Sequence, residues 1–125
     1  MTGYVLDAGA LIAYEKRSRL VSLIVRRARD KGESLPIPAG VVAQVWRGGP
    51  RQAVLAQLLS SDTVEVVPLD DIEARAAGQL CGATGTSDVV DASVVICAQR
   101  RKASVVTSDP RDLRRLDPSL PVVIV

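Results

Sequence analysis

Apolar runs alternate along the chain with amphipathic segments, and this alternation predicts the order of strands and helices. Short runs rich in valine, leucine and isoleucine predict strands at residues 3–6, 35–38, 63–67, 103–106 and 120–125. Apolar residues that recur at three and four positions predict helices at residues 8–15, 18–29, 39–46, 52–59, 70–81, 88–101 and 110–116, with breaks at 48–50 and 82–87. Strands that alternate with helices favour an α/β fold with three layers, α/β/α, and a mostly parallel central sheet.

Composition bounds the organisation of the chain. Its 125 residues suit one domain, and because no change in composition marks a linker, we expect a single domain over residues 1–125. Apolar residues make up 47% and charged residues 24%, which is typical of a globular protein with a buried core. The chain has no signal-peptide pattern and no apolar stretch of roughly 20 residues that would span a bilayer. We therefore expect a cytoplasmic protein that does not associate with membranes.

The rare and missing residue types exclude several kinds of chemistry. The chain has no histidine, which removes Ser-His-Asp and Cys-His catalysis and histidine zinc sites. Its aromatic residues are Trp46, Tyr4 and Tyr14, too few for a platform on which single-stranded nucleic acid stacks. Cys81 and Cys97 are too far apart in sequence for a CxxC motif, and we expect both to be buried apolar side chains. Any catalysis must then depend on carboxylates, lysine or cysteine.

Four aspartates are expected at one edge of the sheet. Asp7 ends the first predicted strand and Asp109 follows the fourth, so parallel strands would bring both to the carboxyl edge, where open α/β sheets bind ligands. Asp88 and Asp91 are three residues apart at the start of a predicted helix and share one face of its first turn. Clustered carboxylates repel one another unless a proton or a cation intervenes. The pattern predicts a site for Mg²⁺ or Mn²⁺, which prefer oxygen ligands and support phosphodiester hydrolysis without histidine.

Helix capping is the alternative interpretation of these aspartates. Asp7 precedes a helix, and Asp109 precedes a proline at the first position of another. Asp88 and Asp91 have the spacing of a capping box, in which the second acid bonds back to the backbone of the first residue. Capping accounts for each aspartate singly, but it accounts less well for the gathering of four at one edge. Both interpretations stay open at this point.

Three motifs in order resemble those of the PIN-domain ribonucleases. They are an opening strand that ends V-L-D before A-x-x-L-I-A, a late helix that opens D-A-S-V-V-I-C-A, and the strand and loop V-V-T-S-D-P-R-D-L. Their order and the chain length are especially similar to the VapC toxins of bacterial VapBC toxin–antitoxin systems. The resemblance covers essentially the whole chain and implies that Asp7, Asp91 and Asp109 are catalytic, metal-binding acids. It also implies that Thr107 supports the pocket as the hydroxyl residue beside the last acid, with Asp88 as an additional metal ligand.

One position departs from this family pattern. The family places an acid, usually glutamate, in the helix after the second strand, where this chain has Gln44. Glutamine has nearly the shape of glutamate and offers a carbonyl oxygen, but it adds no negative charge to a metal site. Asp88 offers a compensating carboxylate one turn before Asp91. The alternative is a weakened or noncatalytic PIN-like module that binds RNA or an antitoxin.

The distribution of charge suits a polyanionic partner. The net charge is +2, and without the four aspartates ten acids face 16 basic residues, a balance of +6. Arg47, Arg51 and Arg111 lie near the expected site in the sequence and are candidates for contacts with RNA phosphates. Arg114 and Arg115 follow Arg111 in the last predicted helix, and they could contact phosphates in the same way. The alternative is an ordinary solvated basic face.

These observations lead to one main hypothesis and two others. The main hypothesis is a Mg²⁺- or Mn²⁺-dependent endoribonuclease that cleaves RNA phosphodiesters as the toxin of a type II toxin–antitoxin pair. The family resemblance further implies a cognate VapB-type antitoxin and a homodimer. The noncatalytic binding module is the second hypothesis. A third, a phosphatase-like hydrolase of the doubly wound class, is disfavoured because residues 7–9 lack the DxD arrangement of such enzymes.

Overall fold

Strands and helices alternate in the structure as the sequence predicts. The structure is a computed structural model that describes residues 3–125. Its strands are β1 (Tyr4–Leu6), β2 (Leu35–Pro38), β3 (Val64–Val67), β4 (Ser104–Thr107) and β5 (Val122–Ile124). Its helices are α1 (Ala8–Glu15), α2 (Arg19–Lys31), α3 (Ala39–Val45), α4 (Ala53–Leu59), α5 (Asp71–Thr84), α6 (Val89–Arg101) and α7 (Pro110–Leu116), with a 3-10 turn η1 (Pro50–Gln52) before α4. The predicted α/β class is confirmed.

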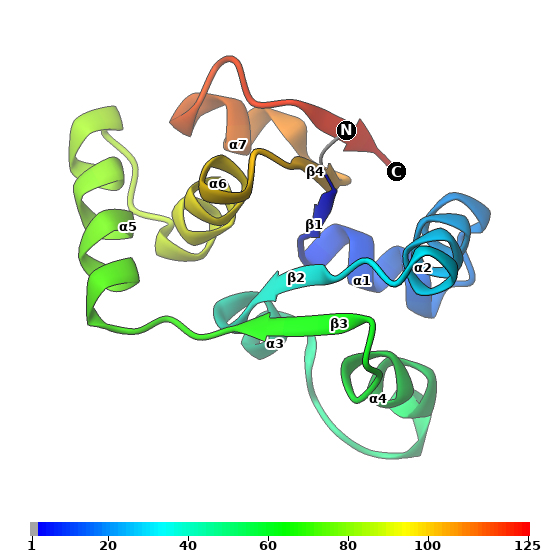
Figure 1. Ribbon diagram of the computed structural model, residues 1–125. Coiled ribbons are helices and arrows are strands. Elements are labelled where there is room, and N and C mark those ends of the chain that lie inside the picture. The colour runs from blue at the N-terminus through cyan, green and yellow to red at the C-terminus, as the bar shows by residue number, and fades with distance from the viewer. Residues whose placement is uncertain (1–2) are drawn as a thin grey trace.

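Every strand pairing in the described residues is parallel. β4 lies between β1 and β5, and β2 pairs with β3. β2 also packs beside β1, although no ladder joins these two strands. The strands therefore follow the spatial order β3, β2, β1, β4, β5 (Figure 1).

Helices cover both faces of this strand layer. On one face α6 packs against β1, β2 and β4, and α5 packs on the outer side of α6. On the other face α1 contacts β1 and β4, while α2 and α4 pack against α1 (Figure 1). The predicted three-layer α/β/α arrangement is confirmed.

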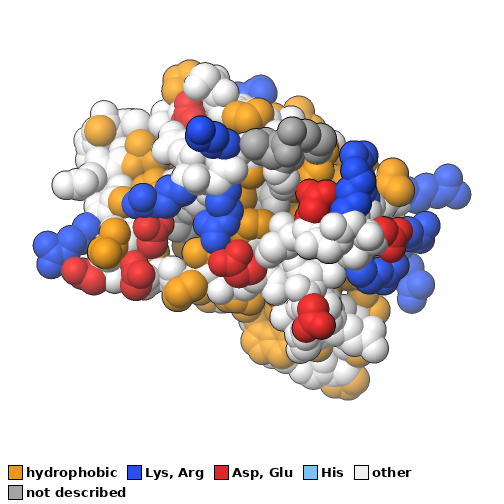
Figure 2. Space-filling view, in the orientation of Figure 1, with side chains coloured by type: hydrophobic (Ala, Val, Ile, Leu, Met, Phe, Trp, Pro, Cys, Tyr) orange, Lys and Arg blue, Asp and Glu red, His pale blue; other side chains and the backbone are white. Residues whose placement is uncertain are grey.

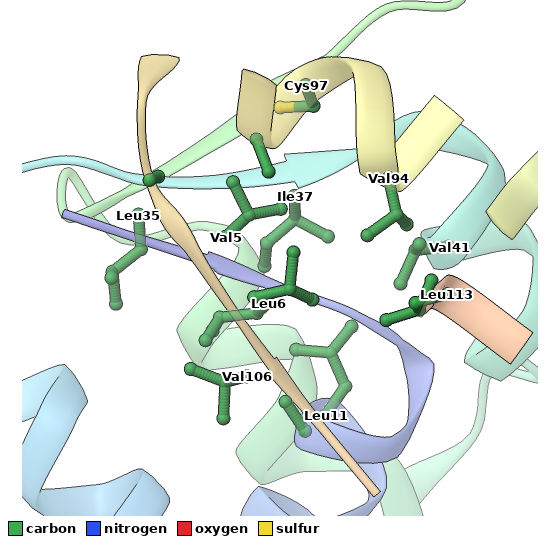
Figure 3. Close-up of a cluster of buried hydrophobic side chains, with 14 of the residues drawn as sticks. Val5, Leu6, Leu11, Leu35, Ile37, Val41, Val94, Cys97, Val106 and Leu113 are labelled. Atoms are coloured by element: carbon green, nitrogen blue, oxygen red, sulfur yellow. The ribbon is translucent and has the colours of Figure 1, made fainter. Parts of the chain in front are cut away.

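The core lies between the central strands and these helices. Val5 and Leu6 of β1 have no exposed surface, because helices cover both faces of this strand. Leu11 of α1 and Val94 of α6 reach the same cluster from opposite sides (Figure 3). A strand buried on both faces explains the continuous apolar run at the start of the chain.

Helix α5 is longer than the sequence predicts. The predicted end at residue 81 is wrong, since the helix continues to Thr84 and stops at Gly85, whose φ of 72° is left-handed. The Thr84 hydroxyl donates a hydrogen bond of 2.8 Å to the Leu80 carbonyl, which supports the added turn. Gly82 is therefore a residue inside the helix, and Gly85 is the C-cap that glycine favours. The predicted loop shrinks to residues 85–88.

Helices α5 and α6 test two expectations, that no segment spans a membrane and that both cysteines are buried. No single helix in residues 3–125 is long and apolar enough to cross a membrane, and these two satisfy such a test only together, as a pair bent by 108°. Cys81 of α5 and Cys97 of α6 are buried and unpaired, as the sequence predicts.

Gln52 organises the loop that follows α3. Its Oε1 accepts hydrogen bonds from the backbone N–H groups of Arg47 at 2.7 Å and Gly48 at 2.9 Å. Its Nε2 donates to the Val45 carbonyl at 2.8 Å. One amide side chain thus binds two backbone N–H groups of the loop and the carbonyl of the last residue of α3.

We predict that Gln52→Ala destabilises the protein by about 1–3 kcal/mol, because it leaves these backbone groups without their partner. Gln57→Ala is the control, since Gln57 is exposed on the neighbouring α4 and makes no side-chain hydrogen bond in the described residues. Urea denaturation followed by circular dichroism measures both changes. Equal stability of the two variants would contradict the bracing role of Gln52.

Candidate functional site

The parallel pairing of β1 with β4 brings Asp7 and Asp109 to the same edge of the sheet. Leu6 is in register with Val106, and the Asp7 N–H extends the pairing by donating to the Val106 carbonyl at 3.3 Å. Asp109 lies two residues past Thr107, where β4 ends. The predicted convergence of these two acids is therefore seen in the structure.

Thr107 connects the two acids. Its side chain is fully buried, and its Oγ1 accepts a hydrogen bond of 3.0 Å from the Asp109 N–H. A hydrogen bond from the same side chain to Asp7 acts to lower the pKa of that carboxyl. A single buried hydroxyl thus contacts the backbone of Asp109 and the side chain of Asp7, and its supporting role in a pocket stays a prediction.

The other two acids lie at the start of α6, which begins near the same edge. Asp88 is the N-cap, and its Oδ1 accepts a hydrogen bond of 3.0 Å from the Asp91 N–H. The return bond of a capping box, from the Asp88 N–H to the Asp91 carboxylate, is not found in residues 3–125. Asp7 likewise caps α1 by accepting from the Ala10 N–H at 3.1 Å, whereas Asp109 makes no side-chain cap bond. Capping therefore accounts for Asp7 and Asp88 but not for Asp91 and Asp109.

Electrostatics shows that the acids act on one another. Burial raises the pKa of Asp91 to about 6, and the negative charges of four more aspartates add to the shift: Asp88, Asp112, Asp7 and Asp109. Burial also raises the pKa of Asp7, against the hydrogen bonds that it accepts and with a small contribution from Asp109. The other three predicted acids all act on Asp91, and Asp109 also acts on Asp7.

A cleft of about 410 Å³ opens beside Asp91. It lies between the loop that joins α5 to α6 and helix α7, and its lining includes Asp88, Asp91, Asp112 and Arg115. Asp7 and Asp109 are outside this lining. Among the charged lining residues, Asp112 is the one that sequence reasoning did not select, whereas Arg115 belongs to the group of arginines expected to contact phosphates. The signal for Asp112 is its position one turn after Asp109 in a helix whose start was predicted correctly.

The remaining predicted site residues, Gln44, Arg47, Arg51 and Arg111, are exposed and do not line this cleft. Gln44 is exposed on α3 and makes no side-chain hydrogen bond to the acids in the described residues. The Arg47 guanidinium donates to the carbonyls of Trp46 at 2.7 Å and Ala43 at 3.3 Å, so it closes the end of α3. Arg51 of η1 and Arg111 of α7 are exposed and do not line the cleft. Their proposed contacts with RNA remain predictions.

The residues at this edge fit a divalent cation in chemistry more closely than in spacing. Carboxylates and a hydroxyl are the ligands that Mg²⁺ and Mn²⁺ prefer. Burial raises the pKa of Asp91 most, and the neighbouring aspartates add repulsion that a cation would relieve. No three His, Cys, Asp or Glu side chains within residues 3–125 are close enough to enclose one ion. Mg²⁺ keeps several waters and usually binds through one or two carboxylates, so a closed cage is not required.

Gly9 allows the start of α1 to approach the loop that follows β4. A Cβ at this position would overlap the Ser108 side chain and lie 2.9 Å from the Ser108 backbone nitrogen. Ser108 immediately precedes Asp109, so the absence of a side chain at Gly9 sets how closely α1 approaches the loop that carries the acid. Sequence reasoning missed this residue because a close approach depends on tertiary packing.

Positive charge is concentrated away from the carboxylates. Residues 16–31 contain seven of the 16 basic residues and only one acid. The ion pair found on this segment joins Arg29 to Asp30 at 3.9 Å, and both side chains are exposed. Figure 2 shows Lys and Arg side chains gathered over α2, at the right of the view. A cluster of basic side chains therefore lies on α2 and the residues just before it, in addition to the predicted contacts at Arg47, Arg51 and Arg111.

Comparison with known families and structures gives consistent matches. The family described as PIN domain matches residues 4–118. The fold is similar to VapBC2 from Rickettsia felis, bound to a DNA fragment from its promoter, with a TM-score of 0.73, 18% identity and coverage of 98% of both chains. PAE2754 from Pyrobaculum aerophilum has a TM-score of 0.64 and 19% identity, over 98% of this chain and 84% of that one.

FitAcB from Neisseria gonorrhoeae has a TM-score of 0.59 and 19% identity over 95% of each chain. A comparison with curated proteins by sequence gives no match. At these identities the solved structures establish a shared fold, and the family match extends over nearly the whole chain.

We predict that Asp91→Asn stabilises the metal-free protein near neutral pH. The pKa of Asp91 is about 6 when folded and near 3.8 when unfolded, so the folded state binds the proton more tightly. Ionisation therefore costs stability as the pH rises from about 4 to 6, and the whole cost is present above 6. Because solvent screens this partly buried group, we expect a gain of about 1–2 kcal/mol at pH 7.5.

Urea denaturation in EDTA at pH 7.5 and pH 4 measures this effect. The advantage of Asp91→Asn should largely disappear at the lower pH, where the folded carboxyl is protonated and the unfolded carboxyl is close to its own pKa. An advantage of the same size at both pH values would show that repulsion of the Asp91 charge is not the cause.

We predict that Gly9→Ala destabilises the protein by about 1–3 kcal/mol, because the added methyl group must displace Ser108. Helix propensity alone gives the opposite expectation, since alanine is better than glycine inside a helix by up to about 1 kcal/mol. Gly78→Ala in α5 is the matched control, because no atom lies within 4 Å of its added Cβ. Thermal denaturation should show a lower Tm for Gly9→Ala and an unchanged or higher Tm for Gly78→Ala. A rise in both would refute the close-approach argument.

Proposed function

This chain belongs to the PIN-domain family, and from that membership we propose that it is a Mg²⁺- or Mn²⁺-dependent endoribonuclease. The observation that carries the proposal is the gathering of Asp7, Asp91 and Asp109 at one sheet edge, where the pKa of Asp91 is raised to about 6. Perturbed carboxylates beside a cleft are typical of catalytic sites. The absence of histidine is compatible with this reaction, since a metal-dependent hydrolase needs no imidazole.

In this proposal Asp7, Asp91 and Asp109 hold the cation, and Asp88 is a further ligand. The chemistry that Mg²⁺ or Mn²⁺ supplies when bound is polarisation of the phosphodiester and activation of a water molecule. Thr107 orients Asp7 and Asp109 through the hydrogen bonds of its buried hydroxyl. These bonds favour the ionised form of Asp7, which is the form that binds a cation.

RNA is the substrate class that we propose. Exposed basic side chains at Arg51 and Arg111 flank the site in sequence, and the α2 surface offers a further area for phosphate contacts. Such contacts position a nucleic acid without selecting its sequence. Membership of the PIN-domain family is the reason for proposing RNA, since positive charge alone would suit any polyanion.

We also propose that the protein acts as a VapC-type toxin in the cytoplasm, with a cognate VapB-type antitoxin and as a homodimer. Two structures with the same fold are described as VapBC2 and FitAB, each bound to DNA. Large apolar side chains are exposed on the helices of one face, which would suit protein partners: Ile12, Leu20, Leu23 and Val54. Trp46 is 40% exposed at the end of α3 and adds an aromatic anchor of the kind enriched at interfaces.

A noncatalytic binding module is the second candidate, and Gln44 is the observation that favours it. The neutral amide removes the acid that the family pattern places in α3, and no three acids in residues 3–125 enclose one ion. A protein of this kind would bind RNA or an antitoxin without cutting RNA.

We predict that Asp109→Asn reduces metal-dependent RNA cleavage at least about 100-fold, as expected for loss of a ligand of a catalytic metal. Asp62→Asn is the control, because Asp62 is exposed just before β3, at the other end of its strand from the site. Cleavage of total RNA and of a labelled oligonucleotide is measured with Mg²⁺, with Mn²⁺ and in EDTA. A similar rate for Asp109→Asn and the wild type would contradict the proposed metal site.

Gln44→Glu separates the two candidate functions. For an active nuclease, the added carboxylate should preserve or increase wild-type cleavage and tighten Mn²⁺ binding measured by calorimetry. If the wild type binds RNA without cutting it and only Gln44→Glu cuts, the noncatalytic candidate is correct.

A further inference from the structure

The cleft beside Asp91 has a second side with different chemistry. It is lined by Gly85, Thr86 and Ser87 from the loop before α6, and by Arg115 and Leu116 from α7. The volume of about 410 Å³ is within the range of small-ligand sites. The cleft therefore extends beyond the carboxylates into a space with donors, acceptors and one cationic side chain.

Only one face of α7 contributes to this cleft. Asp112, Arg115 and Leu116 line it, and their spacing of three and four residues places them on the same side of the helix. Arg111 and Arg114 belong to the same short helix but are absent from the lining. The helical period thus selects one of three neighbouring arginines to face the site.

Arg115 has no ion-pair partner although the cleft is acidic. Asp88, Asp91 and Asp112 line the same space, yet no carboxylate of residues 3–125 lies within 4.0 Å of the Arg115 guanidinium. Other arginines do form such pairs, as Arg100 does with Glu73 at 3.0 Å and Arg101 with Glu65 at 2.8 Å. The fork of donors on Arg115 is therefore available to a ligand.

We propose that this cleft binds one nucleotide of the RNA next to the cleaved bond and that Arg115 holds its phosphate. The planar guanidinium matches two phosphate oxygens at once, which a lysine does not reproduce. Thr86 and Ser87 also line the cleft, and hydroxyl side chains are groups that can bind the ribose 2′-OH, which distinguishes RNA from DNA. The inference rests on the proposed nuclease function and adds a positioning residue to it.

The charges that line the cleft predict that nucleotide binding there depends on a divalent cation. With Asp88, Asp91 and Asp112 ionised, the lining carries two more negative charges than Arg115 offsets, so a phosphate is repelled from the cleft. A divalent cation would remove that excess. Nucleotide binding in the cleft should therefore require both the cation and Arg115, whereas binding to the basic α2 surface requires neither.

The test compares Arg115→Ala and Arg115→Lys with Arg114→Ala. Arg114 is adjacent, exposed and equal in charge but does not line the cleft, so it controls for loss of a positive charge on α7. Binding of a fluorescein-labelled six-nucleotide single-stranded RNA is followed by anisotropy in EDTA and with Ca²⁺, Mg²⁺ or Mn²⁺ before cleavage proceeds. Steady-state cleavage of the same RNA gives kcat and KM, and thermal denaturation checks the fold of each variant.

We expect Arg115→Ala to raise the cation-dependent Kd and KM about ten- to a hundredfold, the usual effect of losing hydrogen bonds to a charged group. Arg115→Lys should be intermediate, and Arg114→Ala should change either value by less than about threefold, as for a screened surface charge. Equal effects of Arg115→Ala and Arg114→Ala would overturn the subsite, even if the wild type cleaves RNA. Binding that depends on Arg115 without cleavage by the wild type would support the subsite and refute the nuclease. Absence of both cation-dependent binding and cleavage would refute both.

Discussion

The candidate site depends on the parallel pairing of β1 with β4. These strands lie at opposite ends of the sequence, and only their register brings Asp7 and the loop of Asp109 to the same edge. Burial on both faces of β1 maintains this register, because a slip of one residue would exchange the sides on which Val5 and Leu6 point. The apolar run that forms the core thus also determines where the charged chemistry lies.

That arrangement gathers like charges, and local hydrogen bonds partly offset the cost. Asp7 accepts bonds from the Ala10 N–H and the Thr107 side chain, and Asp88 accepts from the Asp91 N–H. Helix N-termini also attract negative charge, which favours carboxylates at the starts of α1 and α6. Capping and metal binding are therefore compatible roles, since the hydrogen bonds that begin these helices also orient the carboxylates. Asp91 accepts no such bond in the described residues, and burial together with the neighbouring aspartates raises its pKa to about 6.

Sequence patterns predict the strands, the helix order and the edge at which the acids meet, because these follow from periodicity and from the rule for parallel sheets. They misplace the end of α5, where Gly82 and Gly85 are equally plausible stops and only packing selects the second. They also miss Gly9, whose role depends on the loop that faces it in three dimensions. They include Arg115 among the possible phosphate contacts but do not distinguish it from Arg111 and Arg114, which do not line the cleft. Periodicity relates Arg115 to Asp112 on one helix face, but no pattern shows that this face borders the site.

The neutral residue at position 44 can be understood from the charge of the whole site. Five aspartates interact there, since Asp88, Asp112, Asp7 and Asp109 all act on the pKa of Asp91. One divalent cation and Arg115 together supply three positive charges, so the site already holds more negative charge than they neutralise. If position 44 faces this site, as the family pattern implies, a glutamate there would increase this excess in the metal-free protein. A neutral Gln44 thus avoids further repulsion in the metal-free protein, at the cost of a carboxylate that would tighten cation binding.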